Sequence, residues 1–529
     1  MPPPEEGLRE TGEPPRAAAR LRAFLLVALL AQVGILAFQE VVFFGQMFGR
    51  ASRAGVPGAA PAGSSAVLAL SVVAVSALWA LRGGAGSVSG RFGRAGLVQL
   101  AVLGLALYAG GLASDRFVRL LAAPVVLVSG LLAAALPNRA ARGGRPIVAS
   151  RLGPWDAATG LLLATLAVPA VFPFIHFDAA TIWACRSLGF AGQGFAGALA
   201  ACLHPNYPPL FSLLLAIGAA DPLFEGRLLA WLLVVFFALF LRERVAALSP
   251  ARAPAAILFI FATVHVWQGA AMYYANVPLM AFLTAGALLV LGLPGTGART
   301  SRSDLFAGTA CLAAAVLVRP DGLYYMTALF AALLWHALRG GPRVPVVPFA
   351  AAGAVALSWS LRPALLKASG DFFTHASGGW RALAPTAAES ARVVLGDFLF
   401  AWQGQWLSHK GLGATLYALG AVALASRFVP ARAGPGGERA LYARVTLASL
   451  SAVVVCFLLL PFVGDPVQGA QPHTTTDFRA CFRNVLNVGF GRMAIHLLPF
   501  YVLYVLAVLR SPSRPESAAN IERPARRPD

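Results

Sequence analysis

The residues of this chain that are best suited to chemistry gather between positions 176 and 214, HFDAATIWACRSLGFAGQGFAGALAACLHPNYPPLFSLL. This stretch lies between strongly apolar segments, yet it carries Asp178, Trp183, Arg186, His204, Asn206 and Tyr207. Ionisable groups at the edge of a membrane are costly and generally have a function. Asp178 is our candidate general base, because a carboxylate within hydrogen-bond reach can take a proton from a hydroxyl. The alternative is that Asp178 caps a helix over residues 179–188.

A second group of charged residues occupies the short turn RPDG, which includes Arg319 and Asp321. One interpretation is a turn with a local ion pair, since Pro320 and Gly322 are ordinary turn residues. The other is that Arg319 holds a phosphate by charge-assisted hydrogen bonds while Asp321 supplies a second acid. Arg492, at the start of the last apolar segment, either binds a lipid phosphate or anchors that helix.

His204 and Tyr207 either line a substrate pocket or have a structural role in a loop that Pro205, Pro208 and Pro209 stiffen. His176 and Asp178, with His204 nearby in sequence, do not make a ligand pattern, so no metal ligands are predicted and the role of a divalent cation stays open. Three other histidines are expected to be hydrogen-bonded packing residues: His265, His336 and His496.

The five cysteines show no CxxC or Cys/His metal spacing. Cys185 and Cys202 share one predicted loop, and on an oxidising face of a membrane they could form a disulfide. Without geometry both the paired and the reduced forms stay open.

The composition predicts a polytopic membrane protein. Hydrophobic residues make up 58% of the 529 residues and charged residues only 12%, and the mean hydropathy is +0.71. Soluble domains carry about 25% charged residues. The net charge of +20 does not indicate nucleic-acid binding, because the basic residues recur in small groups between apolar runs.

Apolar stretches long enough to cross a bilayer recur along the whole chain. They predict an all-α transmembrane bundle of about 13–14 spans. The spans are placed at 21–40, 65–81, 96–113, 117–136, 157–176, 226–242, 254–272, 277–293, 304–319, 322–338, 344–360, 411–426, 445–463 and 493–509. Residues 208–219 are apolar but too short to span, and a juxtamembrane helix at the external interface is expected there.

The distribution of charge orients this topology. With a cytoplasmic N-terminus, the inner segments hold 27 basic and 11 acidic residues, and the outer segments hold 15 basic and 11 acidic residues. The positive-inside rule favours this orientation. It places both termini in the cytoplasm, and it places Asp178 outside.

Four motifs, in order, resemble those of the GT-C superfamily of membrane glycosyltransferases, which includes the dolichyl-phosphate-mannose protein mannosyltransferases and the aminoarabinose transferases. They are DAATIWA at 178–184 with YPPL at 207–210, MYYANVPLMAFLTAGALLVL from 272, LVRPDGLYY from 317 and GRMAIHLLPFYVLYV from 491. The resemblance covers residues 156–510. This chain has Asn276 where the family often has Asp, and four additional spans precede the one that leads into Asp178.

The resemblance implies transfer of a sugar from a polyprenyl-phosphate donor to an acceptor at the outer face of a bacterial cytoplasmic membrane. It implies that Asp178 is the general base and that Arg319 and Arg492 stabilise the leaving phosphate. Five further residues are expected to bind substrate: Trp183, His204, Tyr207, Asn276 and Asp321. The acceptor is not identified, and neither is the sugar.

The predicted organisation has four parts. A disordered cytoplasmic tail (1–20) is followed by an additional four-span region (21–155). The GT-C-like region (156–510) has external loops at 177–225, 361–410 and 464–492, and a second disordered tail (511–529) ends the chain. The rival functions are a secondary transporter or lipid flippase, and a non-catalytic membrane subunit of the same fold. No internal repeat of the kind common in transporters stands out.

Overall fold

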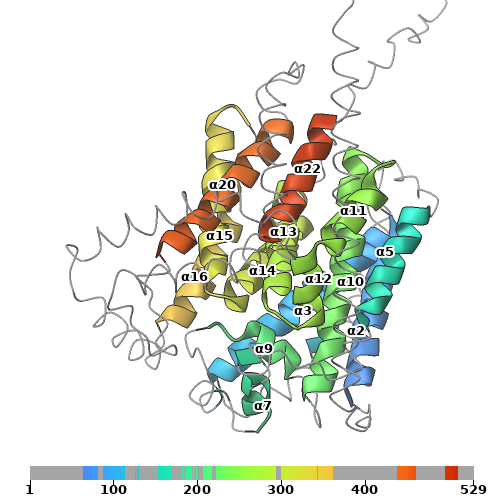
Figure 1. The fold of residues 1–529 in the computed structure, drawn as a ribbon. Helices are drawn as coiled ribbons and strands as arrows, with labels where there is room; N and C mark the ends of the chain where they lie inside the picture. The colour runs from blue at the N-terminus through green and yellow to red at the C-terminus, as the bar shows by residue number, and fades with distance from the viewer. Residues whose placement is uncertain are drawn as a thin grey trace, which may run out of the picture.

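The computed structural model shows a helical protein (Figure 1). It describes residues 64–81, 87–113, 125–126, 128–129, 153–167, 182–183, 185–192, 195, 198, 207–216, 222–292, 300–341, 343–361, 438–459 and 495–509. Within these ranges every regular element is a helix, in agreement with the predicted all-α class.

The helices follow the predicted spans closely. In chain order they are α2 (Ser64–Leu81), α3 (Val88–Ala113), α5 (Pro154–Thr165), α7 (Cys185–Gly192), α9 (Leu210–Leu215), α10 (Pro222–Leu248), α11 (Ala253–Ala262), α12 (Val264–Ala271), α13 (Asn276–Leu291), α14 (Arg302–Val318), α15 (Asp321–Leu338), α16 (Val346–Ser360), α20 (Glu438–Leu459), the 3-10 helix η5 (Ile495–Leu497) and α22 (Leu498–Leu509). Eleven of the fourteen predicted spans coincide at least in part with a helix. The other three, 21–40, 117–136 and 411–426, lie outside the described residues apart from a few helical positions of the second.

One predicted span is wrong as a continuous helix. The stretch 254–272 is divided into α11 and α12 at Thr263, whose backbone is extended with φ −62° and ψ 124°. The Thr263 hydroxyl donates a 2.9 Å hydrogen bond to the carbonyl oxygen of Phe259. Threonine side chains compete in this way for backbone groups and favour a bend or a helix end.

The centre of the molecule is α13, which packs against α14, α10, α15 and η5 (Figure 1). Its residues from Asn276 to Val290 are all buried. A helix that is apolar on every side is stable only when it is surrounded, so its sequence favours this central place. The short helix α9 is also buried at all six positions, between α3, α10 and α7.

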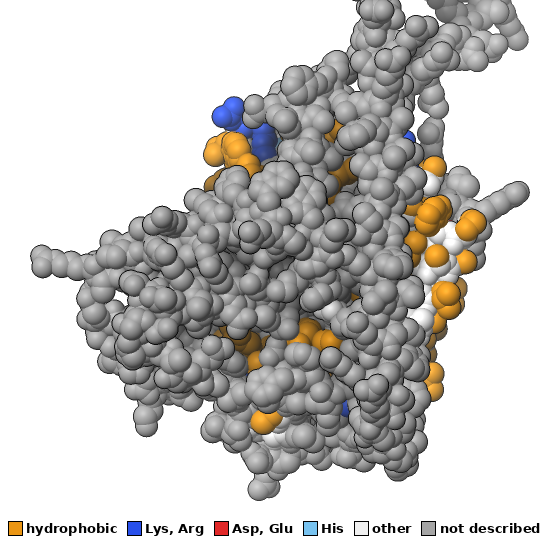
Figure 2. Space-filling model, viewed as in Figure 1, with side chains coloured by type: hydrophobic (Ala, Val, Ile, Leu, Met, Phe, Trp, Pro, Cys, Tyr) orange, Lys and Arg blue, Asp and Glu red, His pale blue; other side chains and the backbone are white. Residues whose placement is uncertain are grey.

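The outer helices present apolar side chains to the surroundings. Figure 2 shows such side chains along the edge that α2 and α5 form. Four large aliphatic residues, on α2, α5, α15 and α16, are more than two-thirds exposed: Leu81, Leu161, Leu338 and Val347. Among the described helices, one, over residues 88–112, is long and apolar enough to cross a membrane, and five shorter apolar helices accompany it. Extended apolar surface of this kind indicates contact with a membrane or another protein.

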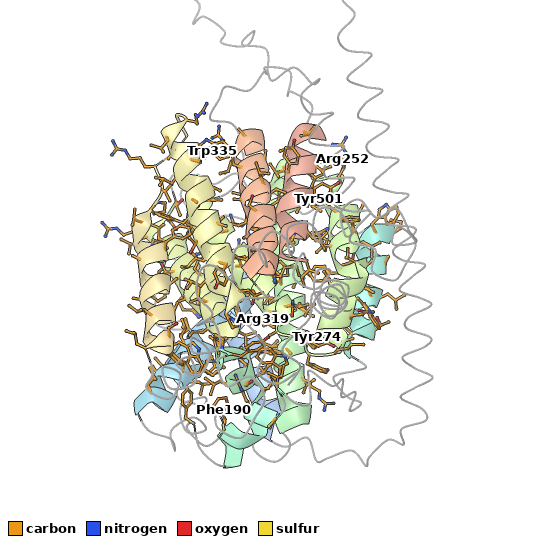
Figure 3. The ribbon with its side chains drawn as sticks, turned by 60° about the vertical axis from the view of Figure 1, so that its left-hand side comes forward. Phe190, Arg252, Tyr274, Arg319, Trp335 and Tyr501 are labelled. Atoms are coloured by element: carbon orange, nitrogen blue, oxygen red, sulfur yellow. The ribbon has the colours of Figure 1, made fainter. Side chains whose placement is uncertain are left out.

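Two ion pairs of the described residues lie at the same end of the helices. Arg94 pairs with Asp304 at 2.6 Å, and Arg242 with Asp156 at 2.8 Å. All four residues belong to segments that were predicted to lie at or near the inner side. Figure 3 shows Arg252 and Trp335 near this end and Phe190 near the other, with Arg319 between them and nearer to Phe190.

Candidate functional site

The candidate site is built around the guanidinium group of Arg319, at the turn between α14 and α15. Its Nε donates a 2.8 Å hydrogen bond to Oδ1 of Asp321, and its Nη1 donates one of the same length to Oδ1 of Asn276. The guanidinium carbon also lies 5.7 Å from the ring centre of Tyr207, within the range of a cation–π contact. Three distant segments of the chain thus meet at one cation.

The turn itself explains the placement of the two charged groups. Arg319 ends α14 in an extended conformation, and Pro320 precedes the first residue of α15. Gly322 permits the close contact of the two helices, because a Cβ at this position would lie 2.5 Å from the carbonyl oxygen of Ala315. The predicted local ion pair between Arg319 and Asp321 is confirmed. The turn also brings Arg319 into contact with Asn276 at the start of α13.

Aromatic rings form the wall beneath Arg319. The rings of Trp183 and Tyr207 are 5.7 Å apart, and Trp183 makes an edge contact at 5.7 Å with Phe211 at the start of α9. Trp183 is 2% exposed and does not face solvent, so its role is to pack against Tyr207. Aromatic pairs at such distances contribute about 0.5–1.5 kcal/mol beyond their burial.

Arg186 on α7 holds the backbone of the same loop. Its Nη1 donates a 2.6 Å hydrogen bond to the carbonyl oxygen of Tyr207. The side chain is fully buried, and burial lowers the pKa of this guanidinium to about 10. A cation that is still charged at neutral pH fixes the position of the Tyr207 main chain.

Asn276 is presented by a strained turn. Between α12 and α13, Tyr273 has a positive φ of 57°, which is rare for a bulky residue. Tyr273 is buried, and Arg227 lies 5.5 Å from its ring centre. The N–H of Tyr274 donates to the carbonyl oxygen of Gly269 at 2.9 Å and closes the turn. Strain that is maintained by its surroundings is typical of functional sites.

The second carboxylate oxygen of Asp321 and the imidazole of His496 also belong to the site. Oδ2 of Asp321 is buried, and neither it nor the two ring nitrogens of His496 has a hydrogen-bond partner among the described residues. The His496 ring makes an edge contact with Tyr325, with ring centres 4.6 Å apart. His496 is fully buried. It was expected to be a hydrogen-bonded packing residue, and in the described part of the chain it is not hydrogen-bonded.

Five of the eight predicted site residues lie together: Trp183, Tyr207, Asn276, Arg319 and Asp321. The other three, Asp178, His204 and Arg492, lie outside the described residues. Sequence reasoning missed His496. The signal that could have found it is an ionisable residue at the start of an otherwise apolar last span.

The described residues contain no group of three or more His, Cys, Asp or Glu side chains that could hold a metal ion. Cys185 is disulfide-bonded. Its pairing with Cys202 stays a prediction, because Cys202 lies outside the described ranges. The site therefore offers a positioned cation, an imidazole and a carboxylate oxygen that has no hydrogen-bond partner among the described residues, all beside aromatic rings.

Three comparisons with known proteins found nothing similar. No protein-family model, no curated protein and no solved structure matches this chain.

Proposed function

We propose that this chain is an integral membrane glycosyltransferase of the GT-C type, which passes a sugar from a polyprenyl-phosphate donor to a hydroxyl acceptor. The observation that carries the proposal is the convergence on Arg319. Tyr207 and Asn276 come from two motifs other than that of Arg319, 112 and 43 positions earlier in the chain, and both contact Arg319. Motifs that resembled this family only by chance would not be expected to meet at one cation.

Two observations support a membrane position with the site on the outer side. Exposed aliphatic side chains lie on the outer helices, and the ion pairs Arg94–Asp304 and Arg242–Asp156 lie at the end opposite to α7 and α9. The disulfide at Cys185 is also suited to an external location, because disulfides persist in oxidising compartments. The proposed location is the cytoplasmic membrane of a bacterium, with both termini in the cytoplasm.

In the proposed reaction, the acceptor hydroxyl attacks the anomeric carbon of the sugar. Asp178 takes the proton of this hydroxyl as general base. The bond between the anomeric carbon and the phosphate oxygen breaks, and its electron pair leaves with the polyprenyl phosphate. Arg319, with Arg492, stabilises the negative charge that develops on this phosphate. Trp183, Tyr207, His204, Asn276 and Asp321 complete the binding site.

The geometry at Arg319 suits this role. A guanidinium has five N–H donors. Two of them are directed at Asp321 and Asn276, which fixes the plane of the group. A group that is fixed before the charge develops stabilises a transition state more than a mobile one, because it does not have to reorganise.

The test is transfer of radiolabelled sugar from a panel of polyprenyl-phosphate donors by the purified full-length protein. We expect labelled product with the wild type and none with Asp178→Asn, because an amide cannot accept the proton. Asp221→Asn is the matched control, since it makes the same change in the same predicted loop. Full activity of Asp178→Asn would contradict the assignment of the base. Donor binding without transfer by the wild type would favour the non-catalytic subunit.

A second candidate function is a secondary transporter or lipid flippase, and the break at Thr263 favours it. Interrupted helices within the membrane are frequent at transporter sites. The polar residues of the described site, however, lie at helix ends and not at this break. Proteoliposomes distinguish the two functions. Translocation of a labelled polyprenyl-phosphate sugar without any glycosylated product would support the transporter.

A further inference from the structure

The charged groups of the site do not favour an anion by themselves. The Arg319 guanidinium is paired with Asp321 at 2.8 Å, so the two together carry no net charge. Both side chains are mostly buried, with 18% and 8% of their surface exposed. A phosphate that approaches Arg319 also approaches the Asp321 carboxylate, and like charges repel strongly where water is scarce.

His496 is placed to relieve this repulsion. It contacts Tyr325, which lies one helical turn after Asp321 on the same face of α15. This contact brings the His496 ring to the first turns of α15, which also carry Asp321. Its two nitrogens and Oδ2 of Asp321 have no hydrogen-bond partner within the described ranges. Buried polar groups generally have partners, so this set is suited to a ligand or a proton.

Protonation of His496 would change the charge of the site by one unit. The Asp321 carboxylate is already paired with Arg319, so a buried imidazolium at His496 would lack a counter-charge of its own, and the ring is neutral when no anion is bound. An anion at Arg319 supplies that counter-charge. We propose that binding of a phosphodiester anion at Arg319 is coupled to the uptake of one proton by His496. The identity of the anion rests on the proposed function.

Among the described residues near His496, the Asp321 carboxylate is the other acceptor for this proton, and the variants below distinguish the two. Tyr325 contacts the ring from α15, and Asp321, which is paired with Arg319, lies one helical turn before Tyr325 on that helix. Of the other helices that contact η5, α13 has no titratable residue, and α22 has Tyr501 and Tyr504. On α20, Glu438, Arg439, Tyr442 and Arg444 belong to the first two turns, at the end near His336, and Cys456 lies near the other end.

The experiment is calorimetric titration of the purified full-length protein at pH 7 in two buffers of different ionisation enthalpy. The probes are a farnesyl methyl phosphodiester and soluble diethyl phosphate. Neither probe ionises near neutral pH, so every proton taken up is bound by the protein. We expect uptake of about one proton per bound phosphodiester by the wild type. Binding by the farnesyl probe alone would identify the lipid chain as part of the ligand.

Variants assign the proton to His496. His496→Gln should take up about no proton and should bind the probe about tenfold more weakly. His336→Gln is the matched control, because His336 is also buried but contacts Arg444 at 2.6 Å at the opposite end. It should retain the uptake of the wild type. Unchanged uptake by His496→Gln would overturn the proposal, and so would absence of binding by the wild type.

The wild type alone gives an independent test if the variant does not fold. When binding takes up one proton, the affinity falls by about tenfold for each unit that the pH rises above the ionisation of the free group. A Kd that is constant between pH 6 and 8 would overturn the proposal. Failure of the proposed function has a different result, since proton-coupled binding would then persist without any sugar transfer.

Discussion

Nη1 of Arg319 donates a 2.8 Å hydrogen bond to Oδ1 of Asn276, which lies 43 positions earlier in the chain. The bond joins the first turn of α13 to the end of α14. It uses a neutral amide at a position where a carboxylate of the same shape would fit. Among the described residues, the amide adds no second carboxylate to the Arg319–Asp321 pair, and this difference can be tested.

The substitution Asn276→Asp adds a negative charge at constant shape. We expect donor binding to weaken by about tenfold, because a second carboxylate beside Arg319 repels the phosphate. Asn276→Ala removes one hydrogen bond to a charged group and should weaken binding by less, about fivefold. The measurement is the donor Kd of the three proteins. Tighter binding by Asn276→Asp would contradict our account of the site charge.

The substitution Arg319→Lys keeps the positive charge but removes the planar guanidinium group with its several N–H donors. A lysine cannot donate to Asp321 and Asn276 in the same plane and still face a phosphate. We therefore expect the rate of sugar transfer to fall about a hundredfold, with the protein still folded. Arg252→Lys at the opposite end of the helices is the control and should leave transfer unchanged. A wild-type rate for Arg319→Lys would exclude directional hydrogen bonding as its role.

The ring of Tyr207 is expected to matter more than its hydroxyl. Its ring centre lies 5.7 Å from the Arg319 guanidinium and 5.7 Å from the centre of Trp183. Tyr207→Leu removes both contacts and should raise the donor Kd about fivefold, since a partly buried cation–π contact contributes about 1 kcal/mol. Tyr207→Phe should remain near the wild type. Equal losses in both variants would assign the effect to the hydroxyl.

At the opposite end, Asp156 is expected to stabilise the fold. Arg242 donates two hydrogen bonds to its carboxylate, at 2.8 and 3.2 Å, and the N–H of Gly153 donates a third at 3.1 Å. Asp156→Asn should lower the free energy of unfolding by about 2 kcal/mol. Asp304→Asn is the control, and its more exposed pair with Arg94 should lose about 0.5 kcal/mol.

The same contribution should depend on pH. Burial alone would raise the pKa of Asp156, but the hydrogen bonds from Arg242 and Gly153 outweigh it and lower the pKa below 3.8. A carboxyl group of this kind stabilises the fold above its unfolded pKa and loses the contribution as the pH falls through its folded pKa. Thermal unfolding of wild type and Asp156→Asn should therefore differ at pH 7 and converge as the pH falls below 3.8.

Much of the site could be predicted because polar residues are rare in this chain. Against 12% charged residues, Arg319 and Asp321 stand out in their short turn. The charge distribution also placed that turn, Tyr207 and Asn276 at the same side, which is a precondition for contact. The residues that Arg319 contacts depend on how α13 is rotated about its axis relative to α14. That rotation could not be predicted, because a helix that is apolar on every side has no polar face in its sequence pattern.

The local departures from regular helix were not predictable in the same way. Thr263 interrupts a stretch whose composition is apolar throughout, and threonine is tolerated within many helices. Tyr273 adopts a positive φ, and such a backbone conformation can be predicted from sequence only where the residue is glycine. His496 resembled a packing histidine, because what distinguishes it is the absence of a partner within the described structure. None of these features has a distinct signal in the residue types alone.

The contact between α3 and α10 has a consequence for the modularity of the chain. A Cβ at Gly93 would lie 2.5 Å from the carbonyl oxygen of Phe236 on α10, so the two backbones touch. Small residues allow such close contact between helices in lipid. Helix α3 also packs against α9, which lies beside the site, and against α14. Helix α3, which precedes residue 156, therefore supports helices of the site, and we expect that a chain cut at that boundary would lose this support.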